Sequence, residues 1–296
     1  MVQFRHAVAL LCLAACNDTH GGQPPIGGAV DTEAEIQRYL RHLYLDLNGR
    51  APTDTELTDA TTRLQVAGNT STARRELVGE LLATSEFATV WTEELENSIF
   101  GGNTLEEQYD LVCGIIRGTD PACLSCSGAD PCACSCPILV AYDDERANLR
   151  LVPIEFADGE KSSALERRYA SGFGYFALAG APETRVRTLF DDFLSRPAEA
   201  DEIENGRSMI FGAIIPGSPA GLMFHRHGAS YADLVDIVFS SEVYRESVVR
   251  RVFDRYLARA TAPIELAHFT ATLDAAEPDL RDVVRAVVSS REYFEQ

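Results

Sequence analysis

The chain has 296 residues, of which 46% are hydrophobic, and this is enough for one large domain or two ordinary ones. Its formal net charge at pH 7 is −19, from 45 acidic and 26 basic residues. Such a charge repels the phosphates of nucleic acids and of anionic lipids, which argues against both as binding partners of the folded surface.

The N-terminus has the pattern of an export signal. After a short basic start, the apolar run Ala7 to Ala15 is too short for a transmembrane helix, which takes about 20 residues, but it fits the apolar region of a signal peptide. Leu13-Ala14-Ala15-Cys16 resembles the bacterial lipobox, in which the cysteine becomes the lipidated N-terminus. We therefore predict a signal peptide over residues 1–15 and lipidation at Cys16. The alternative is a buried first helix that contains this cysteine.

Residues 16–33 are rich in Gly, Pro and polar residues, and this composition predicts a flexible tether behind the lipid. Asn17, rather than Asp, follows the cysteine. By resemblance to the enterobacterial sorting rule, this favours the outer membrane. No second apolar segment of the sequence reaches membrane-spanning length, so we expect an exported protein that is held to the cell envelope by lipid alone.

Three segments of the chain resemble one another, and we predict that they are related helical repeats packed together. They cover residues 34–100, 161–245 and 246–296. Their openings read LRHLYLDLNGRAPTDTEL (40–57), VRTLFDDFLSRPAEADEI (186–203) and VRRVFDRYLARATAPIEL (249–266). Their ends read LLATSEF (81–87), IVFSSEV (237–243) and VVSSREY (287–293).

The spacing of apolar residues predicts three helices in each repeat. In the first repeat, Leu40, Leu43, Tyr44 and Leu47 recur at steps of three and four, which is the pattern of a helix with one buried face. Gly49 is suited to end that helix in a left-handed conformation. The Pro and Thr residues before Glu56 suit the start of the second helix, and residues 77–82 form the third.

Each repeat also carries one Arg and two Glu at matching positions. These residues are Arg50, Glu56 and Glu86, then Arg196, Glu202 and Glu242, then Arg259, Glu265 and Glu292. The polar residues around Arg50 could be taken for a calcium loop, but they lack the twelve-residue spacing and terminal Glu of an EF-hand. We predict a structural role, in which each Arg pairs with the nearer Glu and orders the turn between helices.

The first repeat resembles a bacterial domain of unknown function that accompanies cytochrome c modules in planctomycete-type surface proteins. The resemblance rests on LYLDLNGRAPTDTEL and LLATSEFATVWTEEL and covers residues 40–95. The Ser-Glu-aromatic ends are also similar to helical domains of S-layer-like proteins and phycobilisome linkers. Those domains are assembly modules, so the resemblance implies a scaffold and supplies no catalytic residue. The sequence has no Cys-x-x-Cys-His, so covalent haem is not supported.

A cysteine-rich insert occupies residues 101–160, between the first and second repeats. Its six cysteines are Cys113, Cys123, Cys126, Cys132, Cys134 and Cys136. An even number in an exported protein predicts disulfides, here three with fifteen possible pairings. Cys-x-Cys does not favour an internal bond, so we expect bonds between the two dense clusters or to Cys113. Two alternatives remain: a zinc or iron–sulfur site, and a redox pair of Cys123 and Cys126.

Within the same insert, Ile138–Tyr142 and Leu149–Phe156 flank the polar stretch DDERAN. Their alternation and β-branched content predict a small β-hairpin. The fold class is therefore mainly α, with a disulfide-rich irregular insert and this hairpin.

Other stretches offer weaker chemistry. Met223–Gly228 contains two histidines, which we interpret as a surface loop rather than a metal site, and Ser171–Phe176 as a turn that packs aromatic rings inward. No nucleophile elbow, His-Glu-x-x-His or P-loop occurs, so we predict no enzyme activity and no cofactor. We expect a binding or scaffold lipoprotein with a cell-envelope protein partner. The alternative is an extracytoplasmic redox or metal-binding protein that uses the cysteines.

Overall fold

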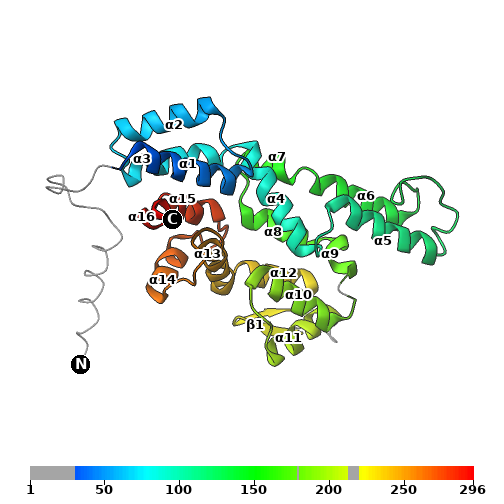
Figure 1. Cartoon of the computed structure of the whole chain (residues 1–296). Helices are drawn as coiled ribbons and strands as arrows, with labels where there is room; N and C mark the ends of the chain where they lie inside the picture. The colour runs from blue at the N-terminus through cyan, green and yellow to red at the C-terminus, as the bar shows by residue number, and fades with distance from the viewer. Residues whose placement is uncertain (1–30, 179, 213–219) are drawn as a thin grey trace, which may run out of the picture. The chain divides into compact units, whose positions relative to one another are not determined.

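Helices form most of the chain, as the sequence predicts, in a computed structural model that describes residues 31–178, 180–212 and 220–296 (Figure 1). Glu33–Gln296 form one compact unit. The predicted signal peptide, Cys16 and nearly all of the tether lie outside the described residues. None of the described helices is long and apolar enough to cross a bilayer.

The elements are described here in chain order. Those before the cysteine-rich insert are α1 (Glu33–Asn48), α2 (Asp54–Val66), α3 (Ser71–Leu82) and α4 (Ser85–Ile99). Those from the insert to residue 178 are α5 (Leu105–Thr119), α6 (Pro137–Leu149), α7 (Val152–Ala157), α8 (Ser162–Ser171) and α9 (Phe173–Leu178). The remainder are α10 (Pro182–Leu194), α11 (Ala200–Phe211), β1 (Gly221–Met223), β2 (Arg226–Gly228), α12 (Tyr231–Phe239), α13 (Glu242–Leu257), α14 (Pro263–Thr272), α15 (Leu280–Val288) and α16 (Arg291–Glu295).

The Ser-Glu-aromatic stretches mark the starts of helices, so each predicted unit of three helices needs a fourth. The hydroxyls of Thr84, Ser241 and Ser290 cap α4, α13 and α16. Each accepts a hydrogen bond from the backbone N–H of the aromatic residue three positions later, which is Phe87, Tyr244 or Tyr293. Such caps satisfy backbone donors that the first helical turn leaves free. The aromatic side chains that follow are buried, which anchors each of these helix starts in the core.

One helix is common to two of the predicted repeats. The series α1 to α4 and the series α13 to α16 each consist of four successive helices. Helices α10, α11 and α12 lead into α13 as well, but β1 and β2 lie between α11 and α12. Helix α13 thus ends the middle series and begins the last. The boundary that we predicted between residues 245 and 246 falls inside this helix. The relationship between the three segments as repeats stays a prediction.

The first and last series pack against each other, α1 on α16 and α3 on α15 (Figure 1). Buried polar groups join them. The Tyr39 hydroxyl donates to the Val288 carbonyl at 3.1 Å, and the Tyr293 hydroxyl donates to Asp46 at 2.7 Å. Because buried polar groups are costly when unpaired, these bonds hold together segments that are far apart in the sequence.

A small β-hairpin is present, but the predicted position was wrong. Ile138–Tyr142 lies in α6, and Leu149–Phe156 runs from the end of α6 through α7. Leu139, Tyr142 and Leu149 lie on one buried face of α6, and packing of that face outweighed the local β-branched signal. The hairpin that does form pairs β1 with β2 around Phe224 and His225, inside the stretch that we interpreted as a surface loop.

Candidate functional site

The cysteine-rich insert forms a helical arm, residues 105–149, in which α5 and α6 lie side by side (Figure 1). Helix α5 buries Tyr109 and Val112, and α6 buries Leu139 and Tyr142. The two tyrosine rings lie 6.3 Å apart between the helices. The connecting segment 120–136, all of which is described, forms turns and bends rather than helix or strand.

Three disulfides cross-link the connecting segment, one of them to α5, which confirms the disulfide prediction. The bonds are Cys113–Cys132, Cys123–Cys136 and Cys126–Cys134. Cys113 belongs to α5, and Cys136 directly precedes α6. Two of the bonds cross between the dense clusters and the third uses Cys113. Because a segment rich in Gly, Asp and Pro buries little apolar surface, we infer that these bonds are what orders it.

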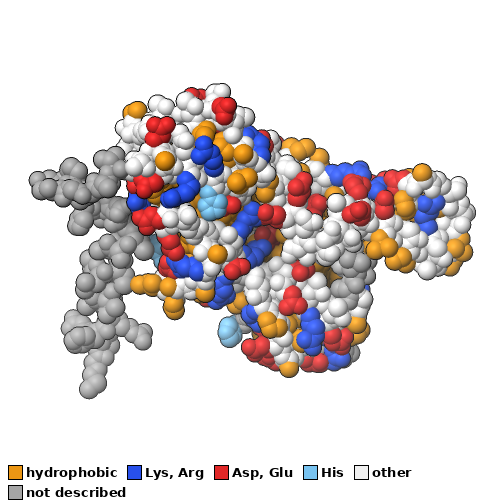
Figure 2. Space-filling view, viewed as in Figure 1, with side chains coloured by type: hydrophobic (Ala, Val, Ile, Leu, Met, Phe, Trp, Pro, Cys, Tyr) orange, Lys and Arg blue, Asp and Glu red, His pale blue; other side chains and the backbone are white. Residues whose placement is uncertain are grey.

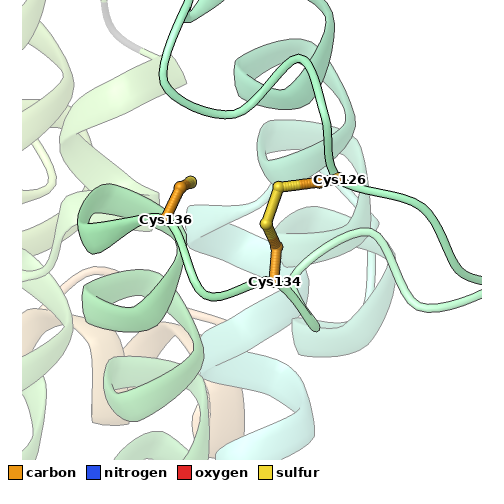
Figure 3. A group of neighbouring side chains, drawn as sticks. All are labelled: Cys126, Cys134 and Cys136. Atoms are coloured by element: carbon orange, nitrogen blue, oxygen red, sulfur yellow. A yellow bond between two sulfur atoms is a disulfide. The ribbon is translucent and has the colours of Figure 1, made fainter.

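The same bonds weaken the metal alternative. The sulfur atoms of Cys126, Cys134 and Cys136 lie within 4.8 Å of one another, the spacing of a possible metal site (Figure 3). Zinc and iron–sulfur clusters bind thiolates. Each of these three sulfurs is already in a disulfide, so none offers a thiolate. The grouping reflects two neighbouring disulfides.

Arg146 is a buried charge centre of the arm that the sequence analysis missed. Only 4% of its side chain is exposed, yet four carboxylates surround it. These are Asp143 at 2.6 Å, Asp130 at 2.9 Å, Asp110 at 3.2 Å and Glu106 at 3.6 Å. Asp130 lies in the connecting segment, so Arg146 ties that segment to α6. The hydrogen bond from Arg146 lowers the pKa of Asp130.

Glu145 fixes the base of the arm to the rest of the body. Its carboxylate accepts hydrogen bonds from the backbone N–H groups of Phe173 at 2.7 Å and Gly174 at 3.0 Å, at the start of α9. The Tyr109 hydroxyl donates to the same carboxylate. One carboxylate therefore joins α5, α6 and α9 at the base of the arm.

The surface of the arm carries large apolar side chains that remain exposed. They are Leu111 (49% exposed), Ile115 (56%), Leu124 (63%), Ile138 (39%) and Val140 (43%). Leu111 and Ile115 are four residues apart and therefore share a face of α5. Residues 105–150 hold eight acidic and three basic residues, a net charge of −5. Figure 2 shows apolar, acidic and basic side chains on the visible face of the arm.

The predicted Arg and Glu residues lie at the turns between helices. Arg50 binds Glu56 through two hydrogen bonds of 2.7 and 2.8 Å, and its Nε atom donates to Glu86 at 2.8 Å. The Glu56 carboxylate also accepts from the Thr53 backbone N–H at 2.7 Å. Gly49, before the arginine, has φ of 67°. The group thus closes a left-handed turn and caps α2.

The other two turns share this geometry in part. Arg259 binds Glu265 at 2.8 Å and Glu292 at 2.5 Å. Arg196 binds Glu202 at 2.6 Å, but no hydrogen bond joins it to Glu242 within the described parts of the chain. Two of the three arginines therefore bridge two helix starts, whereas the middle one serves a single turn.

Acid titration tests this arrangement. Hydrogen bonds from Arg50 and Thr53 lower the pKa of Glu56 from 4.5 to about 2. A carboxyl whose pKa falls on folding stabilises the fold above its unfolded value, and this contribution is lost as the pH drops from 4.5 toward 2. We expect NMR titration of Glu56 to give a pKa near 2, and Arg50→Ala to move it toward 4.5.

Arg63→Ala is the matched control, because Arg63 lies on α2, as Glu56 does, but pairs with Glu80 on α3. This substitution should leave the titration of Glu56 unchanged. An equal rise in both variants, or no rise in Arg50→Ala, would show that Arg50 does not set the ionisation of Glu56.

The remaining candidate residues form no common site. His225 lies in the turn of the hairpin and His227 in β2, and neither belongs to a group of potential metal ligands among the described residues. In Ser171–Phe176, Tyr175 is buried as expected, but Phe173 is 52% exposed and its ring lies 5.6 Å from that of Tyr142 at the base of the arm.

Comparison with models of protein families, with curated proteins and with solved structures found no match to this chain. The resemblance of residues 40–95 to a bacterial surface-protein domain therefore stays a prediction. The arm combines three disulfides with exposed apolar side chains.

Proposed function

We propose that the chain is an exported lipoprotein, anchored through Cys16 and held at the outer membrane, which binds a cell-envelope protein through its arm. The observation that carries this proposal is the set of exposed apolar side chains on a part of the chain braced by three disulfides. Clustered exposed apolar surface is typical of interaction sites, and a rigid binding surface loses less entropy on association.

The charge of the arm supports one class of partner. Residues 105–150, which include Leu111, Ile115 and the other exposed apolar side chains, have a net charge of −5. A second copy of the arm would bring like charges together, and anionic lipid would be repelled as well. The occupant is therefore a different protein, with an apolar ridge bordered by Lys or Arg.

The lipid anchor is tested by growth with a labelled fatty acid. The mature wild-type protein should carry the label and begin at Cys16, because lipidation of this cysteine is what attaches the chain to the membrane. Cys16→Ser should lose both the label and membrane attachment. An unlabelled wild-type protein would contradict the anchor.

Docking is tested by the size of the complex that mild detergent releases from native envelopes. Burying one Leu or Ile side chain contributes about 1.5–3 kcal/mol, so the double variant Leu111→Glu/Ile115→Glu should weaken binding by roughly 100-fold or more. We expect the wild-type chain to elute in a complex with another protein and this variant to elute alone.

The matched control is Val66→Glu/Ile264→Glu, which places the same charges at apolar positions that are 85% and 61% exposed but lie outside the arm. This variant should keep the complex. A wild-type chain that elutes alone or as a homodimer, or a complex that the control disrupts as strongly, would count against the proposal.

The redox or metal-binding alternative has less support. All six cysteines of the insert are in disulfides, and Cys113, Cys123, Cys132 and Cys136 are buried. Thiol exchange needs an accessible sulfur and an attacking thiolate. Among these three bonds, only Cys126–Cys134 has two partly exposed cysteines. Ordering of the connecting segment is enough to explain this bond.

A further inference from the structure

A cleft with a volume of about 250 Å³ lies between α4, α8, α10 and α13, away from the arm. Trp91, Leu95, Val252 and Tyr256 supply apolar and aromatic surface to its wall. Pockets for drug-sized ligands typically measure about 300–1,000 Å³, so this cleft suits a smaller molecule. Its polar side chains come from four different helices, so the cleft forms where these helices pack together.

The two guanidinium groups of the cleft already have carboxylate partners. Arg251 binds Glu166 at 3.1 Å, and Arg255 forms an ion pair with Glu94. Glu166 is buried, and the hydroxyl of Tyr244 donates to it at 2.9 Å. Arg251 lines the cleft, and 30% of its side chain is accessible. An anionic ligand would have to compete with these internal carboxylates.

Two further carboxylates of the cleft, Asp191 and Asp192, form no ion pair with a basic residue among the described parts of the chain. Asp192 accepts a hydrogen bond from the Tyr175 hydroxyl at 2.9 Å. Burial raises the pKa of Asp192 to about 6, which means that its charged form is poorly solvated. A positive charge beside this carboxylate would relieve that cost.

We propose that the cleft binds a small organic cation, a protonated amine with an apolar body, and that Asp192 is its counter-ion. The ammonium group donates to the carboxylate oxygen of Asp192 that Tyr175 leaves free. The apolar body lies against Trp91 and Tyr256, whose aromatic surfaces favour both hydrophobic contact and a nearby cation. This site is separate from the arm and does not depend on the function proposed for it.

The cleft contains its own reporter, because Trp91 is the single tryptophan of the sequence. We would titrate the full folded chain with 2-phenylethylamine and follow Trp91 fluorescence, with calorimetry as a second readout. The amine should bind saturably at one site. Asp192→Asn, which keeps an acceptor for Tyr175 but removes the charge, should weaken binding by about tenfold or more. Asp201→Asn, an exposed carboxylate on α11, should bind like the wild type.

Phenylalanine and 3-phenylpropanoate test whether the cleft prefers a cation. They carry the same ring as the amine, with a zwitterionic or an anionic head group. Both should bind more weakly than the amine. Absence of saturable amine binding would overturn the proposal. Equal amine binding by Asp192→Asn and wild type, or tighter binding of the zwitterion or the anion, would overturn it as well.

Discussion

Replacing Cys113 and Cys132 with serine will destabilise the arm by about 3 kcal/mol, while the helices outside it keep their stability. The bond closes a chain separation of 19 residues, and loops of this size are constrained by about 3 kcal/mol in the chain-entropy account. The connecting segment buries little else that could replace this contribution. Because the arm packs mainly on itself and α9, the loss should be local rather than global.

Hydrogen exchange measures this effect segment by segment. A loss of about 3 kcal/mol corresponds to roughly 100-fold faster exchange in residues 105–149. Exchange in α10 and α13 should change little. Replacing Cys126 and Cys134, which are separated by 8 residues and are less buried, should have a smaller effect. Equal acceleration throughout the body would mean that the arm is not a separate cooperative unit.

Arg146→Met will destabilise the arm by about 3 kcal/mol, at the lower end of the range for breaking a buried ion pair. The arginine is 4% exposed, but its carboxylate partners are about half exposed and can regain water when it is removed. Clustered carboxylates that lose their cation also repel one another. Arg146→Lys should recover part of the loss, because it keeps the charge but not the forked hydrogen bonds.

Arg150→Met is the matched control for this substitution. Arg150 lies on the same side of the arm and pairs with Glu106, but 49% of its side chain is exposed. Exposed pairs contribute about 0–1 kcal/mol. Hydrogen exchange of residues 105–149 should therefore separate the two variants clearly. If the two substitutions had the same effect, the buried position of Arg146 would not matter to the arm.

The sequence predicts the helices well where apolar residues recur at a regular helical spacing. Leu40, Leu43, Tyr44 and Leu47 are all buried, as their spacing predicts, and Arg50 lies against Glu56. These features depend on residues that are near one another in the chain. The disulfide count also follows from composition, although pairing does not, because it depends on how α5 and α6 place the connecting segment.

The features that the sequence analysis missed depend on residues that are distant in the chain. Arg146 lies in a polar stretch that looks like a turn, and its partners Asp110 and Asp130 come from other parts of the arm. In the sequence, Asp192 resembles any exposed acidic residue of an amphipathic helix. Its place in a cleft follows from the packing of α10 against α13, which is distant in the chain. The true hairpin has Phe224 and His225 with φ of 47° and 63°, where Asn or Gly would have given a signal.

Site-specific photo-crosslinking in intact cells tests the central claim, that the arm binds an envelope protein, most directly. A photoreactive residue would be placed at Ile115 or Leu124 on the arm, and at Val66 or Ile264 as exposed positions elsewhere. The account predicts one discrete adduct with another protein at both arm positions, with the attachment point next to Lys or Arg, and none at the control positions. Adducts at Val66 or Ile264 with none on the arm would contradict it.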